Sequence, residues 1–82
     1  MTLEKGESYY AARDRLVASG WVPVPAVCSR DNVCFGHDYP EMASDMKTLK
    51  VCPVFRKDSS KLTVCLDIIP DGANVKSFGV ER

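Results

Sequence analysis

Apolar and polar residues alternate along two stretches in the C-terminal half of this chain, at residues 50–56 and 61–69. A period of two is the pattern of β-strands that cover a core with one face only. The two stretches therefore predict a pair of antiparallel strands. Their apolar face comprises Val51, Pro53, Phe55, Leu62, Val64, Leu66 and Ile68, and the opposite face comprises Cys52, Val54, Arg56, Lys61, Thr63, Cys65 and Asp67.

Turn sequences on either side of the second stretch arrange these strands as a meander. The four residues from Lys57 to Ser60 are predicted to form a hairpin loop. Pro70-Asp71-Gly72-Ala73 is typical of a turn, because proline fixes φ and glycine accepts a positive φ. Residues 75–80 then predict a third strand. Its large apolar residue, Phe78, is expected in the core together with Phe55.

A helical period is clear at residues 8–19, where one face carries Tyr9, Ala12, Leu16 and Ser19. Gly20 is expected to end this helix in the left-handed conformation, and Trp21 to pack back on the last turn as a core residue. The helix should lie across the apolar face of the sheet. The predicted fold class is α+β: one N-terminal helix packed on a three- to four-stranded antiparallel sheet that disulfides cross-link.

The segment between helix and hairpin has no regular period. Pro23 and Pro25 exclude residues 21–27 from the centre of a sheet, because proline cannot donate to a ladder, so this segment is expected at an edge. Residues 28–50 are expected to form a long irregular loop with a short helical turn near 40–43, where Pro40 would be the first helical residue. A loop of this length in a small domain is usually functional or cross-linked.

Length and charge narrow the class of protein. Eighty-two residues make a single domain, in which residues 1–6 are expected to be disordered or foreign to the natural chain. Eleven basic residues balance eleven acidic ones, which disfavours nucleic-acid binding. No stretch approaches the ~20 apolar residues of a membrane helix. Nothing in the composition indicates a cofactor.

Four cysteines in so short a chain favour disulfides and an oxidising compartment. Cys52 and Cys65 are symmetric about the predicted hairpin loop, so their Cβ atoms should lie roughly 4.5–5.5 Å apart, close to disulfide spacing. We prefer the pairing Cys28–Cys34 with Cys52–Cys65, because both bridges are local. A Cys34–Cys52 bridge from loop to sheet is the rival.

Two other interpretations of the cysteines are a metal site and free buried thiols. Cys28, Cys34 and His37 lie within ten residues, but structural zinc usually takes two closely spaced pairs such as CxxC, which this chain lacks. His37 is also the sole histidine and invites an acid–base role. Such a role needs a nucleophile and an orienting partner, and no serine here carries a motif. We therefore predict neither an enzyme nor a metal protein.

The polar loop is the predicted binding surface. Residues 31–47 mix aromatic anchors with polar groups, as the centres of protein interfaces do. Asp45 and two other acidic residues there would suit a basic partner cleft. The alternative is that Phe35 and Tyr39 tuck inward and cover an open sheet edge. The candidate contact residues are Phe35, His37, Asp38, Tyr39 and Glu41.

Three motifs together resemble a group of small exported proteobacterial proteins of unassigned activity. They are Tyr10-x2-Arg13-x2-Leu16-x3-Gly20-Trp21-x-Pro23, then Tyr39-Pro40-Glu41, then the apolar spacing from Cys52 to Phe55 that leads into Leu62-Thr63-Val64. The resemblance implies an exported, non-catalytic domain and names no substrate. Proteins of that group often have a cysteine shortly after Tyr-Pro-Glu. This chain has Ser44-Asp45 there, which leaves Cys34 as the substitute partner for Cys52.

The sequence thus predicts a small periplasmic or secreted protein-binding domain, with an inhibitor or immunity protein against a secreted or cell-wall-active enzyme as the expected role. The missing signal peptide is expected to have been removed from the mature protein. One alternative is a phage or mobile-element protein that blocks a host complex in the cytosol. A second alternative is a small metal or thiol protein that uses Cys28, Cys34 and His37. A protein partner is expected in the first two cases.

Overall fold

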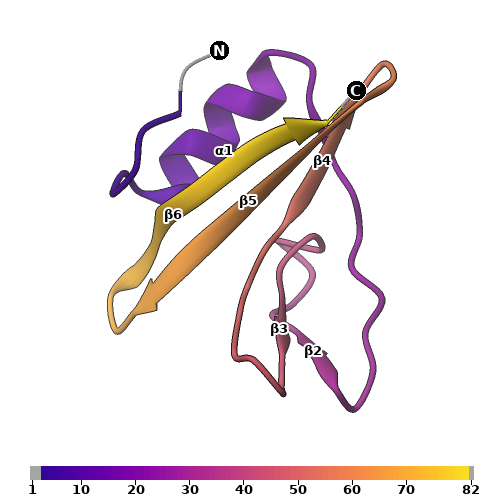
Figure 1. The fold of residues 1–82 in the computed structure, drawn as a ribbon, viewed down its shortest axis with the longest axis vertical. Coiled ribbons are helices and arrows are strands. Elements are labelled where there is room, and N and C mark those ends of the chain that lie inside the picture. The colour runs from indigo at the N-terminus through magenta and orange to yellow at the C-terminus, as the bar shows by residue number, and fades with distance from the viewer. Residues whose placement is uncertain (1–2, 82) are drawn as a thin grey trace.

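The computed structural model describes residues 3–81 and has the predicted α+β architecture (Figure 1). One helix is followed by six strands, of which four form the main sheet and two form a smaller one. The elements are α1 (Tyr9–Ala18), β1 (Val22–Pro23), β2 (Asn32–Cys34), β3 (Ala43–Asp45), β4 (Val54–Lys57), β5 (Ser60–Ile69) and β6 (Gly72–Glu81).

The main sheet is antiparallel and has the order β1-β4-β5-β6. The predicted hairpin register is confirmed, since Arg56 lies opposite Lys61. The turn is tighter than predicted, because Lys57 still pairs with Ser60 and leaves a two-residue loop. β1 pairs only with β4 and is an edge strand, as its prolines require. The meander is therefore extended by one short strand on the β4 side.

The strand bounds differ from the prediction at β4 and β6. β4 begins at Val54 rather than near residue 50, because Pro53 has no N–H to donate to the ladder. The chain nevertheless stays beside β5, whose Val64 and Leu66 N–H groups donate to the carbonyls of Pro53 and Val51. β6 starts three residues earlier than predicted, and a bulge interrupts its ladder with β5 between Cys65 and Leu66.

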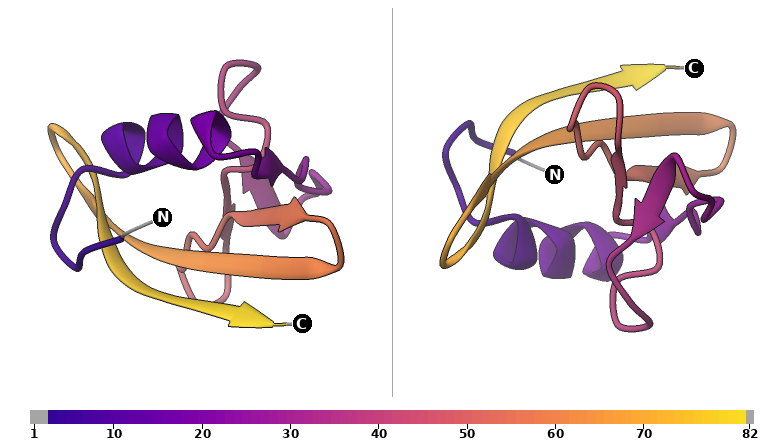
Figure 2. Two further views of the ribbon diagram at one scale, coloured as in Figure 1. Left: turned by 90° about the horizontal axis from the view of Figure 1, so that it is seen from above. Right: turned by 90° about the horizontal axis from the view of Figure 1, so that it is seen from below.

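Helix α1 lies over one face of the sheet, and the core fills the space between them (Figure 2). The helix matches the predicted range to within one residue at each end, and Gly20 ends it with a φ of 96°. Trp21 follows as a core residue, as predicted. The fully buried side chains of this layer include Tyr9, Leu16, Phe55, Leu62, Val64 and Val75.

Two residues predicted in the core are instead exposed. Phe78 is 42% exposed and Ile68 is 49% exposed, although both have the periodicity of the apolar face. The reason is length. A ten-residue helix spans ~15 Å, whereas a ten-residue strand spans ~33 Å, so α1 covers only part of the β5–β6 hairpin. Phe78 lies on the uncovered part of the outermost strand.

The N-terminal residues are also more ordered than predicted. Leu3 is buried in the core at 8% exposure, and the Gly6 N–H donates to the Val75 carbonyl at 2.6 Å. Residues 3–6, which we expected to be disordered or foreign to the natural chain together with residues 1 and 2, thus pack against the core and the sheet, while residues 1 and 2 lie outside the described range. Ser8 and Asn74 form an isolated bridge beside these contacts. The segment thus extends the sheet beside the first half of β6.

The predicted loop contains a second, smaller sheet. β2 and β3 pair antiparallel with Val33 opposite Ser44, at the end of the molecule away from α1 (Figure 1). We call residues 26–50 the lobe. The short helix predicted near Pro40 is a single turn instead, closed by the Met42 N–H on the Tyr39 carbonyl. This turn reaches back toward α1 and joins the lobe to the main core.

Candidate functional site

Two disulfides set the framework on which the candidate site is built. Cys28–Cys34 closes a short loop within the lobe with a Cα–Cα distance of 5.5 Å, and Cys52–Cys65 joins β5 to the segment before β4 with a Cα–Cα distance of 4.0 Å. This is the pairing that we preferred from the sequence. The rival Cys34–Cys52 bridge, with the substitute pairing that the resemblance implied, is wrong.

The disulfides leave no thiol for metal binding or nucleophilic chemistry. All four cysteines are oxidised, so a Cys28, Cys34 and His37 site has lost the thiolates that would bind zinc. Within residues 3–81, no cluster of three or more His, Cys, Asp or Glu side chains is arranged to hold a metal ion. The structure therefore gives no support to the interpretation as a metal or thiol protein.

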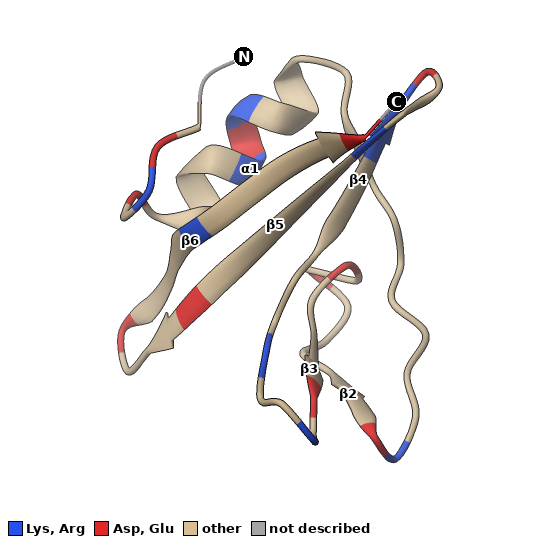
Figure 3. Cartoon of the chain, viewed as in Figure 1, with Lys and Arg blue, Asp and Glu red and all other residues tan. Residues whose placement is uncertain are grey.

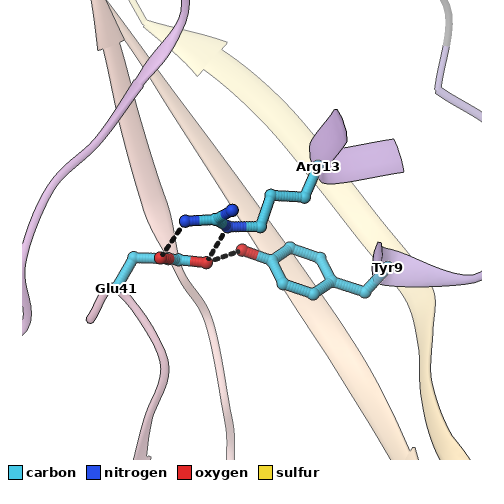
Figure 4. A network of polar contacts seen from close by, with 3 residues as sticks. All are labelled: Tyr9, Arg13 and Glu41. Carbon is cyan, nitrogen blue, oxygen red and sulfur yellow. Dashed lines mark hydrogen bonds and ion pairs between the residues drawn. The ribbon is translucent and has the colours of Figure 1, made fainter. Parts of the chain in front are cut away.

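The centre of the site is a buried carboxylate. Glu41 is only 3% exposed, and both of its oxygens accept hydrogen bonds from α1 (Figure 4). Oε2 accepts from the Tyr9 hydroxyl at 2.5 Å and from Arg13 Nε at 2.7 Å, while Oε1 accepts from Arg13 Nη2 at 3.2 Å. Such a bidentate pair fixes both position and orientation. The turn at residues 39–42 is thereby locked onto the helix.

The electrostatics of this cluster explain why a charge is tolerated in the core. Burial, together with the hydrogen bond to Glu41, raises the pKa of Tyr9, so its hydroxyl remains a donor. The hydrogen bond to Glu41 likewise raises the pKa of Arg13. Among the described residues, no buried side-chain nitrogen or oxygen lacks a hydrogen-bond partner. The carboxylate is thus fully satisfied, which is the condition for keeping a charge inside.

Tyr39 packs over the same cluster. Its ring lies 4.9 Å from the Tyr10 ring, and the Arg13 guanidinium carbon lies 5.0 Å from its centroid. Arg13 therefore contacts an aromatic face and a carboxylate together, a combination that suits the flat guanidinium group. Tyr39 is partly buried against the core. The lobe is attached to α1 by an ion pair and by aromatic packing.

The five predicted contact residues divide into two groups. Phe35, His37 and Asp38 are exposed on the lobe. The alternative was that Phe35 and Tyr39 both tuck inward over an open sheet edge. Tyr39 does pack inward, but against Tyr10 and Arg13 of α1. The expectation that Glu41 presents its charge to a partner is wrong, because its carboxylate is buried and neutralised by Arg13.

The acidic loop that we expected is also not acidic in the structure. Once Glu41 is paired with Arg13, the remaining acidic residues of the lobe are matched by an equal number of basic ones. These residues are Asp31, Asp38 and Asp45 against Arg30, Lys47 and Lys50. Figure 3 shows both signs distributed over the helix, the strands and the lobe. A basic partner cleft therefore has no particular charge attraction here.

Sequence reasoning missed the partners of Glu41. The helical pattern places Tyr9 on the face toward the core and gives Arg13 no partner. The signal that could have found them is the resemblance itself, because its motifs contain Tyr10, Arg13, Tyr39 and Glu41. These residues lie far apart in the sequence and meet in one cluster. The motifs therefore coincide with the attachment of the lobe.

The lobe carries several large apolar side chains that are exposed. Its exposed large hydrophobic side chains, with their exposed fractions, are Val27 (83%), Val33 (48%), Phe35 (49%), Met46 (49%) and Leu49 (70%). Beside Phe35, the Cys28–Cys34 bridge, Pro25, His37 and Pro40 line a shallow groove. Single exposed apolar residues are ordinary, but Phe35 also borders this groove, which gives it the concave surroundings typical of a binding site. Leu49 borders a different pocket, beside Cys65 and Ile68.

Comparisons with known proteins add no functional assignment. The chain matches no protein-family model, no curated protein and no solved structure. Over residues 3–81, the structure contains no helix with the length and apolar character needed to cross a membrane.

Proposed function

We propose that this chain is a non-catalytic, exported protein-binding domain whose partner surface is the outer side of the lobe. The observation that carries the proposal is the contrast between the two sides of that lobe. Its inner side is fixed to α1 by the Arg13–Glu41 ion pair and the packing of Tyr39. Away from α1, the lobe leaves Phe35 exposed beside a groove that the Cys28–Cys34 bridge also lines, and four further large apolar side chains of the lobe are exposed as well.

A fixed scaffold with an exposed apolar tip suits tight binding. Association costs free energy when loops must be ordered, and a lobe held at both ends has already lost that freedom. Phe35 at the groove is the natural anchor, because aromatic residues carry much of the binding energy in protein interfaces. An inhibitor or immunity protein against a secreted or cell-wall-active enzyme is the role that we favour on these grounds.

Export is supported by the use of all four cysteines in disulfides. Such bridges persist in oxidising compartments and are rare in the cytosol. A cytosolic protein that blocks a host complex would keep its thiols reduced. Alkylation of thiols in the cell, followed by mass spectrometry of non-reduced peptides, distinguishes the two, and alkylated cysteines in the native protein would reject export.

Site-specific photocrosslinking tests the surface. A photoreactive amino acid at Phe35 should capture one defined protein from a periplasmic extract, and the same probe at Asp14 on the outer face of α1 should not. Binding of that protein should then weaken by more than ~1 kcal/mol in Phe35→Ala and Leu49→Ala, with melting unchanged. Equal capture from both positions, or equal affinity in the variants, would reject the lobe as the partner surface.

A further inference from the structure

The two edges of the main sheet differ sharply. On one side, β1 has only two residues, and Pro23 and Pro25 hinder further pairing. On the other side, β6 has ten residues. The N-terminal segment covers only its first half, where the Val75 carbonyl accepts from Gly6 and the Val75 N–H donates to the Glu7 carbonyl. The second half of β6 carries no proline, and nothing in residues 3–81 pairs with its outer edge.

The backbone groups on this edge can be assigned from the register. Val64 lies opposite Phe78, and Leu62 lies opposite Val80. Val64 donates its N–H to Pro53, on the β4 side, so its backbone faces away from β6. In an antiparallel ladder such residues form non-hydrogen-bonded pairs, which means that the backbone groups of Phe78 and Val80 also point outward.

The same two residues carry the exposed apolar side chains of the edge. Phe78 is 42% exposed and Val80 is 47% exposed. Both project to the apolar face, because opposed residues share a face and their partners Val64 and Leu62 are buried. Natural sheets usually protect an exposed edge with charges, prolines or a covering segment. A bulge and Lys76 lie at one end of the open stretch and Glu81 at the other, and the four residues between them, Ser77 to Val80, carry no charge, proline or covering segment.

We infer that β6 pairs with β6 of a second copy, antiparallel and across a two-fold axis at Gly79, to form a continuous eight-stranded sheet. This register opposes Phe78 to Val80 of the other copy. Both residues then exchange N–H to carbonyl hydrogen bonds on each side of the axis. Their side chains meet on the apolar face, and Gly79 places no side chain at the axis.

Register and charge both favour a second copy over another partner. The interface is isologous, so every contact is made twice. On the opposite face the register sets Ser77 against Glu81 of the second copy. The side chain of Lys76 lines that same face beside Ser77 and is therefore next to the opposing Glu81. Opposite charges are thus brought together at both ends, and no like charges are opposed among the described residues.

Cysteine crosslinking tests the register. At the axis, the Cα atoms of the paired Gly79 residues would lie ~4.5 Å apart, within reach of a disulfide. The Cys52–Cys65 bridge spans the same kind of pair, between Pro53 and Val51, at 4.0 Å. A Cβ added at Gly79 meets nothing within 4 Å. Gly79→Cys should therefore form an interchain disulfide on oxidation, while Ser77→Cys, whose equivalents lie roughly 13 Å apart along the strands, should not.

Sedimentation tests the association without added thiols. The natural chain should show a concentration-dependent dimer. Val80→Pro, which removes an outward N–H and fixes φ at that position, and Phe78→Lys should raise the dimer dissociation constant by about tenfold or more. Val22→Lys, on the opposite edge at 62% exposure, is the matched control and should leave dimerisation unchanged. Melting at dilution, where each variant is monomeric, checks that all are folded.

The proposed dimer would be overturned by a natural chain that stays monomeric up to about millimolar concentration. It would also be overturned if Ser77→Cys crosslinks as readily as Gly79→Cys, or if Val22→Lys abolishes association while Phe78→Lys does not. None of these outcomes bears on the lobe, so the proposed partner surface stands or falls separately.

Discussion

Arg13 and Glu41 are 28 residues apart in the sequence, and their side chains form a two-point ion pair in the fold, with Nε to Oε2 at 2.7 Å and Nη2 to Oε1 at 3.2 Å. The arginine comes from the only helix in residues 3–81 and the glutamate from the turn that leads into β3. The pair thus joins the lobe to the core, and its integrity should decide how well the lobe is held.

Removing one partner of this pair should be worse than removing both. Arg13→Met leaves the Glu41 carboxylate buried without its main counter-charge, and we expect a loss of about 3–5 kcal/mol in unfolding free energy. Adding Glu41→Leu removes the orphan charge and should restore a large part of that loss. Chemical denaturation of both variants measures this. A double variant less stable than Arg13→Met would contradict the arrangement.

Tyr9 should resist ionisation in the folded protein. Its raised pKa means that the folded state keeps the phenol neutral above pH 10, while the unfolded chain ionises there. The stabilisation is fully present below that pH and is lost as pH rises above it. Tyrosinate absorbance should show one of the three tyrosines titrating only with unfolding. In Tyr9→Phe that late step should be absent, and stability at neutral pH should fall by about 1.5–3 kcal/mol.

The ion pair of Glu7 should make a smaller contribution to the pH dependence of stability, at acidic pH. A hydrogen bond from Arg15 lowers the pKa of Glu7 in the folded state. A lowered folded pKa gives stability that is present above the usual value of 4.5 and is lost as pH falls below it. The stability difference between the natural chain and Glu7→Gln should therefore shrink when unfolding is measured at progressively lower pH. A difference that is independent of pH would show that the pair contributes nothing through charge.

The two disulfides should differ in how much they stabilise the protein and in which part of it they protect from local unfolding. Replacing Cys52 and Cys65 by alanine opens the larger loop and should cost about 3 kcal/mol in the chain-entropy account, against about 2.4 kcal/mol for Cys28 and Cys34. Hydrogen exchange distinguishes them further. The Cys28–Cys34 variant should lose protection within the lobe while β5 and β6 keep theirs. Uniform loss in both variants would contradict this separation.

Tyr39 should act as a structural cover. Tyr39→Leu keeps an apolar side chain but removes the ring contacts with Tyr10 and Arg13, which are worth about 1 kcal/mol for the aromatic pair and about 0.5–1 kcal/mol for the cation. A lower melting temperature is the expected result. His37→Ala, on the exposed part of the lobe, is the control and should melt like the natural chain. An unchanged melting temperature in Tyr39→Leu would contradict the structural role, and Tyr39 would again be a candidate contact residue for the partner.

Local patterns were enough to predict most of the elements. The helix, the β4–β5 hairpin with its register and the Cys52–Cys65 bridge follow from periodicity and turn chemistry within short windows. The edge position of the proline segment followed in the same way, because proline lacks the N–H that a central strand must donate. Each of these features depends on groups that are close in sequence.

Features that depend on distant groups were decided only by the tertiary structure. Whether Phe78 is buried depends on how far α1 reaches over β6, and periodicity carries no information about that reach. The role of Glu41 depends on Tyr9 and Arg13, which the fold brings to it from another element. A carboxylate in a polar loop is usually solvated, and it can be buried only where the fold supplies a counter-charge and donors together. The sequence by itself therefore determined the helix, the strands of the main sheet and the cross-links. The small β2–β3 sheet, and which side chains remain available to a partner, were decided only by the packing of distant segments.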